Sequence, residues 1–244
     1  MNERLDDHKS YEIMPGIHWV GFADKKAGFS NNPYLLIDKD GTGVLIDPGS
    51  RAEEHFSIVK HKIEQLIDFK KIKYIIVHHQ DPDLCASIPL FEELIGVDNV
   101  SIITSLRTSF FVPYYGSKAE IIIIDDGDEF ELPSGRKLKF ITTPYVHFAG
   151  AFVTFDTETG TLFSSDIFAA FSLEWNLFAN EHYVEAVKAF TEPYIGCKEP
   201  VLAVIEKIKD LPIKCIAPQH GSVIKENFGI YIEALKEMHY GAWL

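Results

Sequence analysis

The chain has 244 residues, of which 46% are hydrophobic, and its 36 acidic residues against 23 basic ones give a formal net charge of −13. This length is enough for one large domain with a full hydrophobic core. Because no Pro/Gly/Ser-rich linker, charge block or repeat divides the sequence, we predict a single domain over residues 1–244. The acidic charge argues against nucleic acid and anionic membrane surfaces as partners, because both attract basic proteins.

The first eight residues are polar and acidic, and no later apolar run is long enough to cross a bilayer. We therefore expect no signal peptide, no membrane insertion and a cytoplasmic location. The cysteines are few and far apart, at Cys85, Cys197 and Cys215. Their odd number argues against a disulfide framework, and the absence of a CxxC pair argues against a zinc–thiolate site.

The first half of the chain alternates short apolar runs with turn signals. Before residue 50, strands are predicted at 17–22, 34–38 and 43–47. Turn residues at 31–33 and 39–43 separate them, which indicates an antiparallel meander. Apolar residues at helical spacing then predict a helix over 52–69, and a buried strand follows at 74–77.

After this strand the pattern becomes mixed. A helix is predicted from 84 to 94, opened by Asp83, although Pro89 falls within its first turns. Further strands are predicted at 101–104, 121–124, 137–143 and within 151–165, and a last helix at 198–209. Such an order fits two sheets packed together with helices on the outside.

A polar stretch directly follows the buried strand at 74–77. In it, His79, Asp81 and Asp83 stand at alternate positions, from which an imidazole and two carboxylates can converge on one or two metal ions. Proline and aspartate cannot continue a central strand, so the stretch is predicted to be a loop at the strand's carboxyl end, where open α/β sheets keep their sites. The alternative is a polar turn with Asp83 as the N-cap of the next helix.

Three later strands end in a comparable way. Each is followed at once by one potential metal ligand: His147, Asp166 and His220. Taken alone, either histidine is more often a core or surface imidazole, and an aspartate there is more often a helix cap. It is improbable that four strands of one chain are each followed by potential metal ligands for unrelated reasons. We therefore predict that these side chains meet at one sheet edge.

These motifs resemble those of the metallo-β-lactamase superfamily, and most closely its flavodiiron branch. That branch carries H-x-E-x-D-H, then a histidine after T-P, an aspartate after F-S-x and a histidine in an H-G motif. The matching stretches here are His79–Leu84, Thr143–His147, Leu162–Asp166 and Pro218–Gly221. The similarity covers essentially the whole chain, and the fold it implies is α/β: an αβ/βα four-layer sandwich with metals at one sheet edge.

The resemblance implies two metals held by six side chains: one by His79, Asp81 and His147, the other by Asp83 and His220, with Asp166 bridging. Two departures stand out. Asp81 replaces a glutamate of the flavodiiron proteins, and Leu84 replaces a histidine and cannot ligate. The second metal would be short of protein ligands, which leaves positions for water, a diatomic gas or an inward-turned His78, although His78 lies off the alternation of the motif.

The donor set favours iron. Compared with a hydrolytic dizinc site, the six side chains of this chain offer two fewer nitrogen donors and one more carboxylate. Hard anionic donors of this kind suit iron or manganese. Two ferrous ions nearly balance three carboxylates, whereas two ferric ions need a bridging oxo, hydroxo or peroxo group to offset their charge. Zinc has no accessible redox couple and is the less favoured metal. Five aromatic residues near the ligand positions are expected to make the site a dry pocket, and the alternative is that they are simply part of the core: Tyr145, Phe148, Phe163, Phe168 and Phe171.

The function that the resemblance implies is that of the stand-alone oxygen-binding diiron proteins, which lack the flavodoxin domain. The chain has no phosphate-cradling Gly-rich loop, so we expect no flavin within it. We therefore predict a non-haem diiron protein that binds O2, or NO, as a sensor or carrier, with a chemotaxis receptor or an external redox partner and a homodimeric state. The alternatives are an O2 or NO reductase using an external electron donor, a dizinc hydrolase, and a metal-free scaffold.

Overall fold

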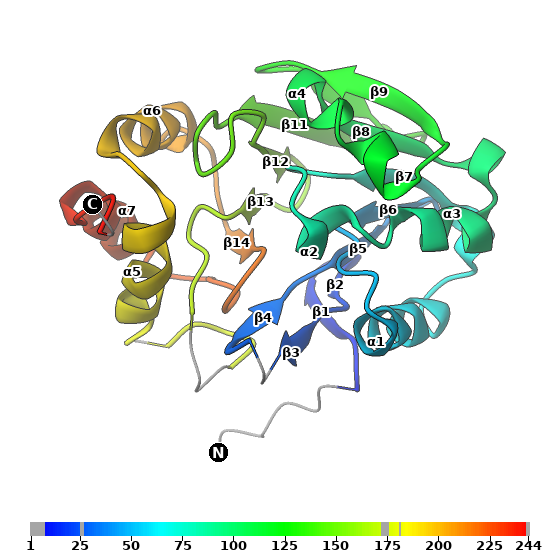
Figure 1. Cartoon of the computed structure of the whole chain (residues 1–244), viewed down its shortest axis with the longest axis horizontal. Helices are drawn as coiled ribbons and strands as arrows, with labels where there is room; N and C mark the ends of the chain where they lie inside the picture. The colour runs from blue at the N-terminus through cyan, green and yellow to red at the C-terminus, as the bar shows by residue number, and fades with distance from the viewer. Residues whose placement is uncertain (1–7, 25–26, 172–175, 181, 243–244) are drawn as a thin grey trace.

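Two β-sheets pack face to face in the computed structural model, and helices lie on the outer side of each sheet (Figure 1). The structure describes residues 8–24, 27–171, 176–180 and 182–242. Within these residues, no helix is long and apolar enough to cross a membrane.

The first sheet is formed mostly by the N-terminal half of the chain. In spatial order its strands are β1 (Tyr11–Met14), β2 (Ile17–Trp19), β5 (Tyr34–Ile37), β6 (Gly43–Ile46), β7 (Ile72–Ile76), β8 (Ser101–Ser105) and β9 (Glu120–Ile124). The pairs up to β5–β6 are antiparallel, and those from β6 to β9 are parallel. A separate antiparallel pair is made by β3 (Phe22–Asp24) and β4 (Phe29–Asn31). The predicted meander is confirmed, and β1 and this pair are added to it.

The second sheet follows in the chain. Its strands, in spatial and chain order, are β10 (Glu129–Glu131), β11 (Lys137–Thr142), β12 (Phe152–Asp156), β13 (Thr161–Ser165) and β14 (Cys215–Pro218). Only the last pair, β13–β14, is parallel. Because β13 and β14 run the same way, their carboxyl ends reach the same edge of the sheet.

Helices complete the outer layers. On the side of the first sheet are α1 (Glu53–Glu64), α2 (Pro82–Cys85), α3 (Ile88–Ile95) and α4 (Leu106–Ser109), with short 3-10 turns at Phe69–Lys71, Val97–Asn99 and Val112–Tyr115. The second sheet is covered by α5 (Tyr183–Tyr194), α6 (Lys198–Ile208) and α7 (Phe228–Glu237).

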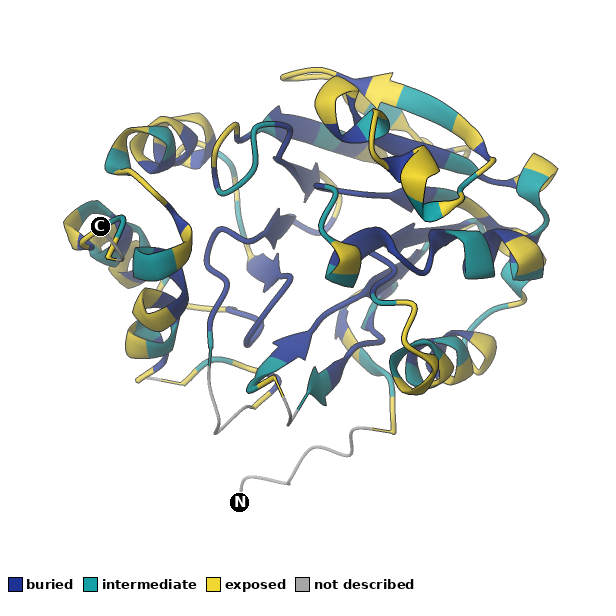
Figure 2. Ribbon diagram, in the orientation of Figure 1, coloured by how far each residue is buried: buried dark blue, intermediate teal, exposed yellow. Residues whose placement is uncertain are grey.

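Alternation along the strands builds the layers, because successive side chains of a strand point to opposite faces. In β6, Val44 and Ile46 join the core between the sheets, while Leu45 joins the core under α1 and α3. In β13, Phe163 points between the sheets and Leu162 packs toward the helices of the other side. The central strands β6, β12, β13 and β14 are accordingly buried along both faces, whereas the edge strands β9 and β10 carry exposed residues (Figure 2). The predicted four-layer α/β sandwich is confirmed.

The helix predicted over 84–94 is wrong in its form. The segment contains two helices, α2 and α3, and the N-cap of α2 is Asp81 rather than Asp83. Pro82 occupies the first turn of α2, and Pro89 the first turn of α3, where a missing N–H costs no helical hydrogen bond. Each proline therefore starts a helix, and the chain turns between them.

Candidate metal centre

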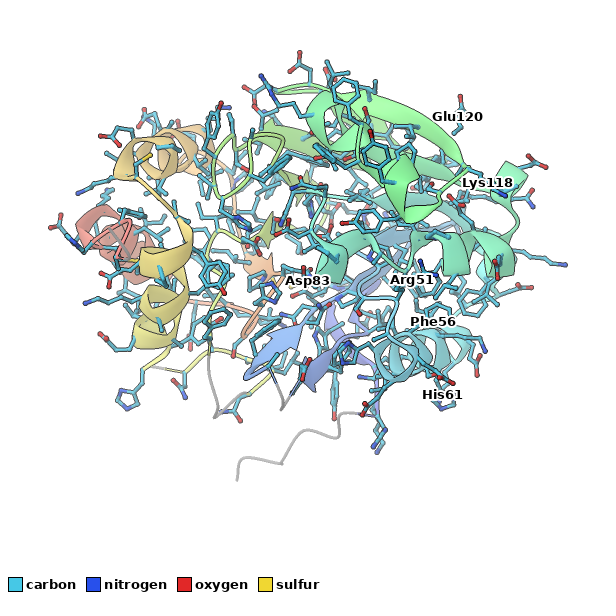
Figure 3. The ribbon with its side chains drawn as sticks, in the orientation of Figure 1. Arg51, Phe56, His61, Asp83, Lys118 and Glu120 are labelled. Atoms are coloured by element: carbon cyan, nitrogen blue, oxygen red, sulfur yellow. The ribbon has the colours of Figure 1, made fainter. Side chains whose placement is uncertain are left out.

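The six predicted side chains lie together at the edge where carboxyl ends of strands from both sheets meet. His79 follows β7, Asp81 precedes α2 and Asp83 lies within it; Figure 3 labels Asp83 at α2, between the two sheets. The remaining three follow strands of the second sheet: His147 after β11, Asp166 after β13 and His220 after β14. The strand-end prediction therefore holds for the placement of all six.

His79, Asp81 and His147 form one half of the cluster, here called the first half. Their ligand atoms all lie within 4.8 Å of one another. The Oδ2 atom of Asp81 is 3.5 Å from His79 Nε2 and 3.4 Å from His147 Nε2. One imidazole nitrogen of each histidine and one carboxylate oxygen therefore face a common point.

Asp83 and His220 form the second half, with Asp166 between the halves. The Oδ2 atom of Asp83 lies 3.2 Å from His220 Nε2. Asp166 Oδ2 lies 3.1 Å from His79 Nε2 and 3.0 Å from His147 Nε2, while its Oδ1 is 3.7 Å from His220 Nε2. One oxygen of Asp166 thus faces each half, which is the arrangement of a bridging carboxylate.

Two atoms at the centre lack hydrogen bonds. His79 Nε2 and Asp166 Oδ1 are fully buried, and among the described residues neither has a hydrogen-bond partner in good geometry, although His79 Nε2 lies close to the other oxygen of Asp166. Because a buried polar atom without a partner is costly, the presence of two such atoms on neighbouring side chains of the cluster fits metal ligation. The chemistry of the donor set agrees, since imidazole and carboxylate together suit first-row metals such as iron.

The opposite ring nitrogens of two histidines are held by neighbouring groups. His220 Nδ1 lies 2.8 Å from the carbonyl oxygen of Ser30, and His79 Nδ1 lies 3.1 Å from Ser165 Oγ. A carbonyl can only accept, so His220 carries its proton on Nδ1 and keeps Nε2 for a metal. Gly221 comes next with φ of +87°, and a Cβ there would collide with the hydroxyl of Tyr183, so the turn after His220 requires glycine.

The carboxylates shift the protonation of the histidines. Burial alone lowers the pKa of His79, but Asp166 and Asp81 outweigh it and raise this pKa well above its usual value. The same opposition of burial and carboxylates raises the pKa of His147 to about 9. In turn, the imidazoles hold the pKa of Asp166 well below its usual range despite its burial. Without metal, the cluster is a set of buried ion pairs.

Metal binding should therefore release protons. Ligation needs neutral imidazole, and His147 keeps its proton up to about pH 9, so we expect metal affinity to increase as the pH rises from 6 toward 9. About one proton or more should leave with the first metal, which calorimetry in buffers of different ionisation enthalpy would count. The ion pairs stabilise the metal-free fold below the unfolded histidine pKa of about 6.5, and this stabilisation is lost as the pH rises through about 9. A pH-independent metal affinity over this range would contradict the ion-pair arrangement.

His78 is held away from the cluster. Its Nδ1 lies 2.5 Å from Asp47 Oδ2, and its Nε2 lies 2.9 Å from Thr154 Oγ1. Both ring nitrogens are thus engaged, and the inward turn considered for His78 is not what the structure has. Leu84, at the position where a histidine was expected by resemblance, is fully buried.

Aromatic rings line the second half, but most of them are not the predicted ones. Phe29 meets His220 edge-on with ring centroids 4.8 Å apart, and Phe190 stacks on Tyr194 at 4.9 Å. Phe171 contacts both Phe190 and Tyr194, at 5.0 and 5.3 Å. Of the five aromatic residues that the sequence suggested, only Phe171 belongs to this group. The others lie elsewhere: Phe163 and Phe168 in the cores, Tyr145 exposed, and Phe148 against Phe111.

The matching family model is described as "ODP family beta lactamase" and covers residues 29–221. The chain belongs to this family. All six clustered side chains fall within the matched range, as do Ser30, Ser165 and Gly221 around them.

Relatives of this ODP-family chain include longer proteins. An uncharacterized protein of Methanocaldococcus jannaschii is 32% identical over 242 residues, which cover 93% of this chain and 60% of that protein. An anaerobic nitric oxide reductase flavorubredoxin of Aeromonas hydrophila is 25% identical, over 89% of this chain and 47% of the relative. The ODP-family chain thus spans about half the length of these curated relatives.

Solved structures give the same picture. A flavo di-iron protein mutant from Thermotoga maritima matches with a TM-score of 0.83 and 28% identity, over 93% of this chain and 60% of that one. The structure titled "Peroxy diiron species of chemotaxis sensor ODP" matches with a TM-score of 0.80 and 28% identity, over 96% of both chains. The metallo-β-lactamase fold and the kinship with flavodiiron proteins are therefore confirmed for this ODP-family chain.

Proposed function

We propose that the protein is a non-haem diiron protein that binds O2, or NO, and serves as an oxygen sensor or carrier. The observation that carries this proposal is the position of Asp166, which turns one buried oxygen toward His79 and His147 and the other toward His220. Two groups of ligands that share one carboxylate can hold two metal ions rather than one.

In this proposal His79, Asp81 and His147 hold one iron, Asp83 and His220 hold the other, and Asp166 bridges. Two iron ions supply reversible electron transfer to a diatomic gas, which zinc does not. The residues of the chain orient and shield this chemistry. Ser30 fixes the tautomer of His220, and the rings of Phe29 and Phe171 present an apolar wall on that side, which favours a small apolar gas over water.

The similarity to a chemotaxis sensor over 96% of both chains supports a sensing role and a receptor as partner. The similarity to flavorubredoxins supports the second candidate, an O2 or NO reductase that takes electrons from an external redox partner. A homodimer and a cytoplasmic location remain part of the proposal. The two roles differ in turnover, because a sensor holds its gas and a reductase consumes it.

The decisive experiment is iron loading without oxygen. We expect about two iron ions per chain, and a persistent new absorption band in the visible spectrum once O2 is added. His79→Ala should lose iron and the band, whereas His61→Ala should keep both, because His61 is an exposed histidine on α1 (Figure 3). Rapid consumption of O2 or NO with a simple reductant would contradict the sensor role and favour the reductase role. Two zinc ions and no spectral response would overturn both and favour a hydrolase.

A further inference from the structure

The short strand β4 and the residue after it hold the loop that carries His220. Ser30 Oγ accepts from Gly221 N at 2.7 Å, and the Ser30 carbonyl accepts from His220 Nδ1 at 2.8 Å. Asn32 Nδ2 donates to the carbonyls of Pro218 and Gly221, both at 2.9 Å. Ser30 and Asn32 are both fully buried, so these bonds form away from water.

Asn31, between them, reaches the other ligand of the second half. Its Nδ2 donates to the carbonyl oxygen of Asp83 at 3.0 Å. Gln219, next to His220, donates through Nε2 to Asn31 Oδ1 at 3.3 Å. The exposed fractions of Asn31 and Gln219 are 3% and 1%. One buried amide therefore ties the start of α2 to the His220 loop.

The first half has separate supports. Ser165 Oγ lies 3.1 Å from His79 Nδ1, and Gln80 Nε2 donates to Asp81 Oδ1 at 3.3 Å. These contacts come from β13 and from the loop after β7, and none of them involves β4. The side-chain contacts that hold the first half are thus different from those that hold the second, although Asp81 and Asp83 share the start of α2.

We propose that Ser30, Asn31 and Asn32 are positioning residues for the second metal alone, with Asn31 setting the distance between Asp83 and His220. This rests on the proposed diiron function. Among the residues that the structure describes, the second half has two ligands of its own beside the shared Asp166, so its affinity depends on how well those two are preorganised. Partners that orient metal ligands typically contribute 10- to 100-fold in affinity.

The test is stepwise Fe²⁺ binding under anaerobic chelator competition. In Asn31→Ala, the first iron should bind with wild-type affinity and the second about 10- to 100-fold more weakly. Asn31→Asp keeps the shape but loses the donor to Asp83, and it should weaken the second iron likewise. Gln219 donates through Nε2 to Asn31 Oδ1 and, at 3.5 Å, to the Asp83 carbonyl, so Gln219→Met removes the weaker part of the same link. It should weaken the second iron in smaller degree, and it provides the test if the Asn31 variants fold poorly.

Two control variants distinguish a positioning role of Asn31 at the second metal from a general loosening of the fold. Asn99→Ala also removes an amide that donates to a backbone carbonyl, that of Ile95, and should change neither iron. Ser165→Ala should weaken the first iron rather than the second. Equal weakening of both irons in Asn31→Ala, or none, would overturn the proposal. A wild-type chain that binds fewer than two metals would instead overturn the proposed diiron function itself.

Discussion

Asp166→Ala should abolish binding of both metals, taking iron from about two per chain to nearly none. Each oxygen of this carboxylate faces a different half, so its removal deprives both metals of an anionic ligand in a site with 1% exposure. It also removes a major source of the raised pKa of His79, so burial then favours the neutral imidazole. Metal analysis after anaerobic loading measures the effect.

The matched control is Asp156→Ala, which removes another buried aspartate of the second sheet. Asp156 accepts from Arg136 through both of its oxygens, so its loss should destabilise the fold by about 3–5 kcal/mol. It takes no part in the cluster, and the folded fraction should still bind about two irons. An Asp166→Ala chain that retains one iron would mean that this carboxylate serves one half only, and the bridging arrangement would then be wrong.

The layers and the cluster were predictable because both follow from strong periodic signals. The strand β6, and β7 from Tyr74 onward, are apolar on both faces, as buried parallel strands are, and a polar residue after such a run stands out. His79 and His220 were found in this way. The prediction that they meet at one site depended on four strands ending in this way, since either histidine taken alone is more often an ordinary core or surface residue.

The supports of the site were missed for physical reasons. Serine and asparagine are common turn residues, so the sequence around Ser30, Asn31 and Asn32 predicts a turn. In the structure their side chains instead bind backbone groups that are distant in the sequence, and no sequence pattern indicates such contacts. The helix α5 was not predicted; it contains Pro193 near its end, which weakens a helical signal. Without α5, Phe190 and Tyr194 could not be placed near the histidines. Only the tertiary fold brings these segments together.

Leu84→His is expected to tighten the second metal by about 10- to 100-fold. Leu84 follows Asp83 directly on α2 and is fully buried, at the position where the resemblance implies a histidine in flavodiiron proteins. An imidazole there would give the second half a third ligand of its own. Without metal the same imidazole would be buried with no partner, which costs about 1–3 kcal/mol, so the melting temperature of the metal-free protein should fall while that of the loaded protein rises.

The same substitution should weaken the response to O2, because the added imidazole takes a position that a gas would otherwise use. Leu84→Asn, of similar size but a poorer ligand, should lower stability without tightening the metal. Unchanged metal affinity in Leu84→His would mean that this position does not face the second half. Tighter metal together with a weaker absorption change on oxygenation would identify Leu84 as the residue that keeps a position open for a gas in the proposed diiron centre, at the expense of metal affinity.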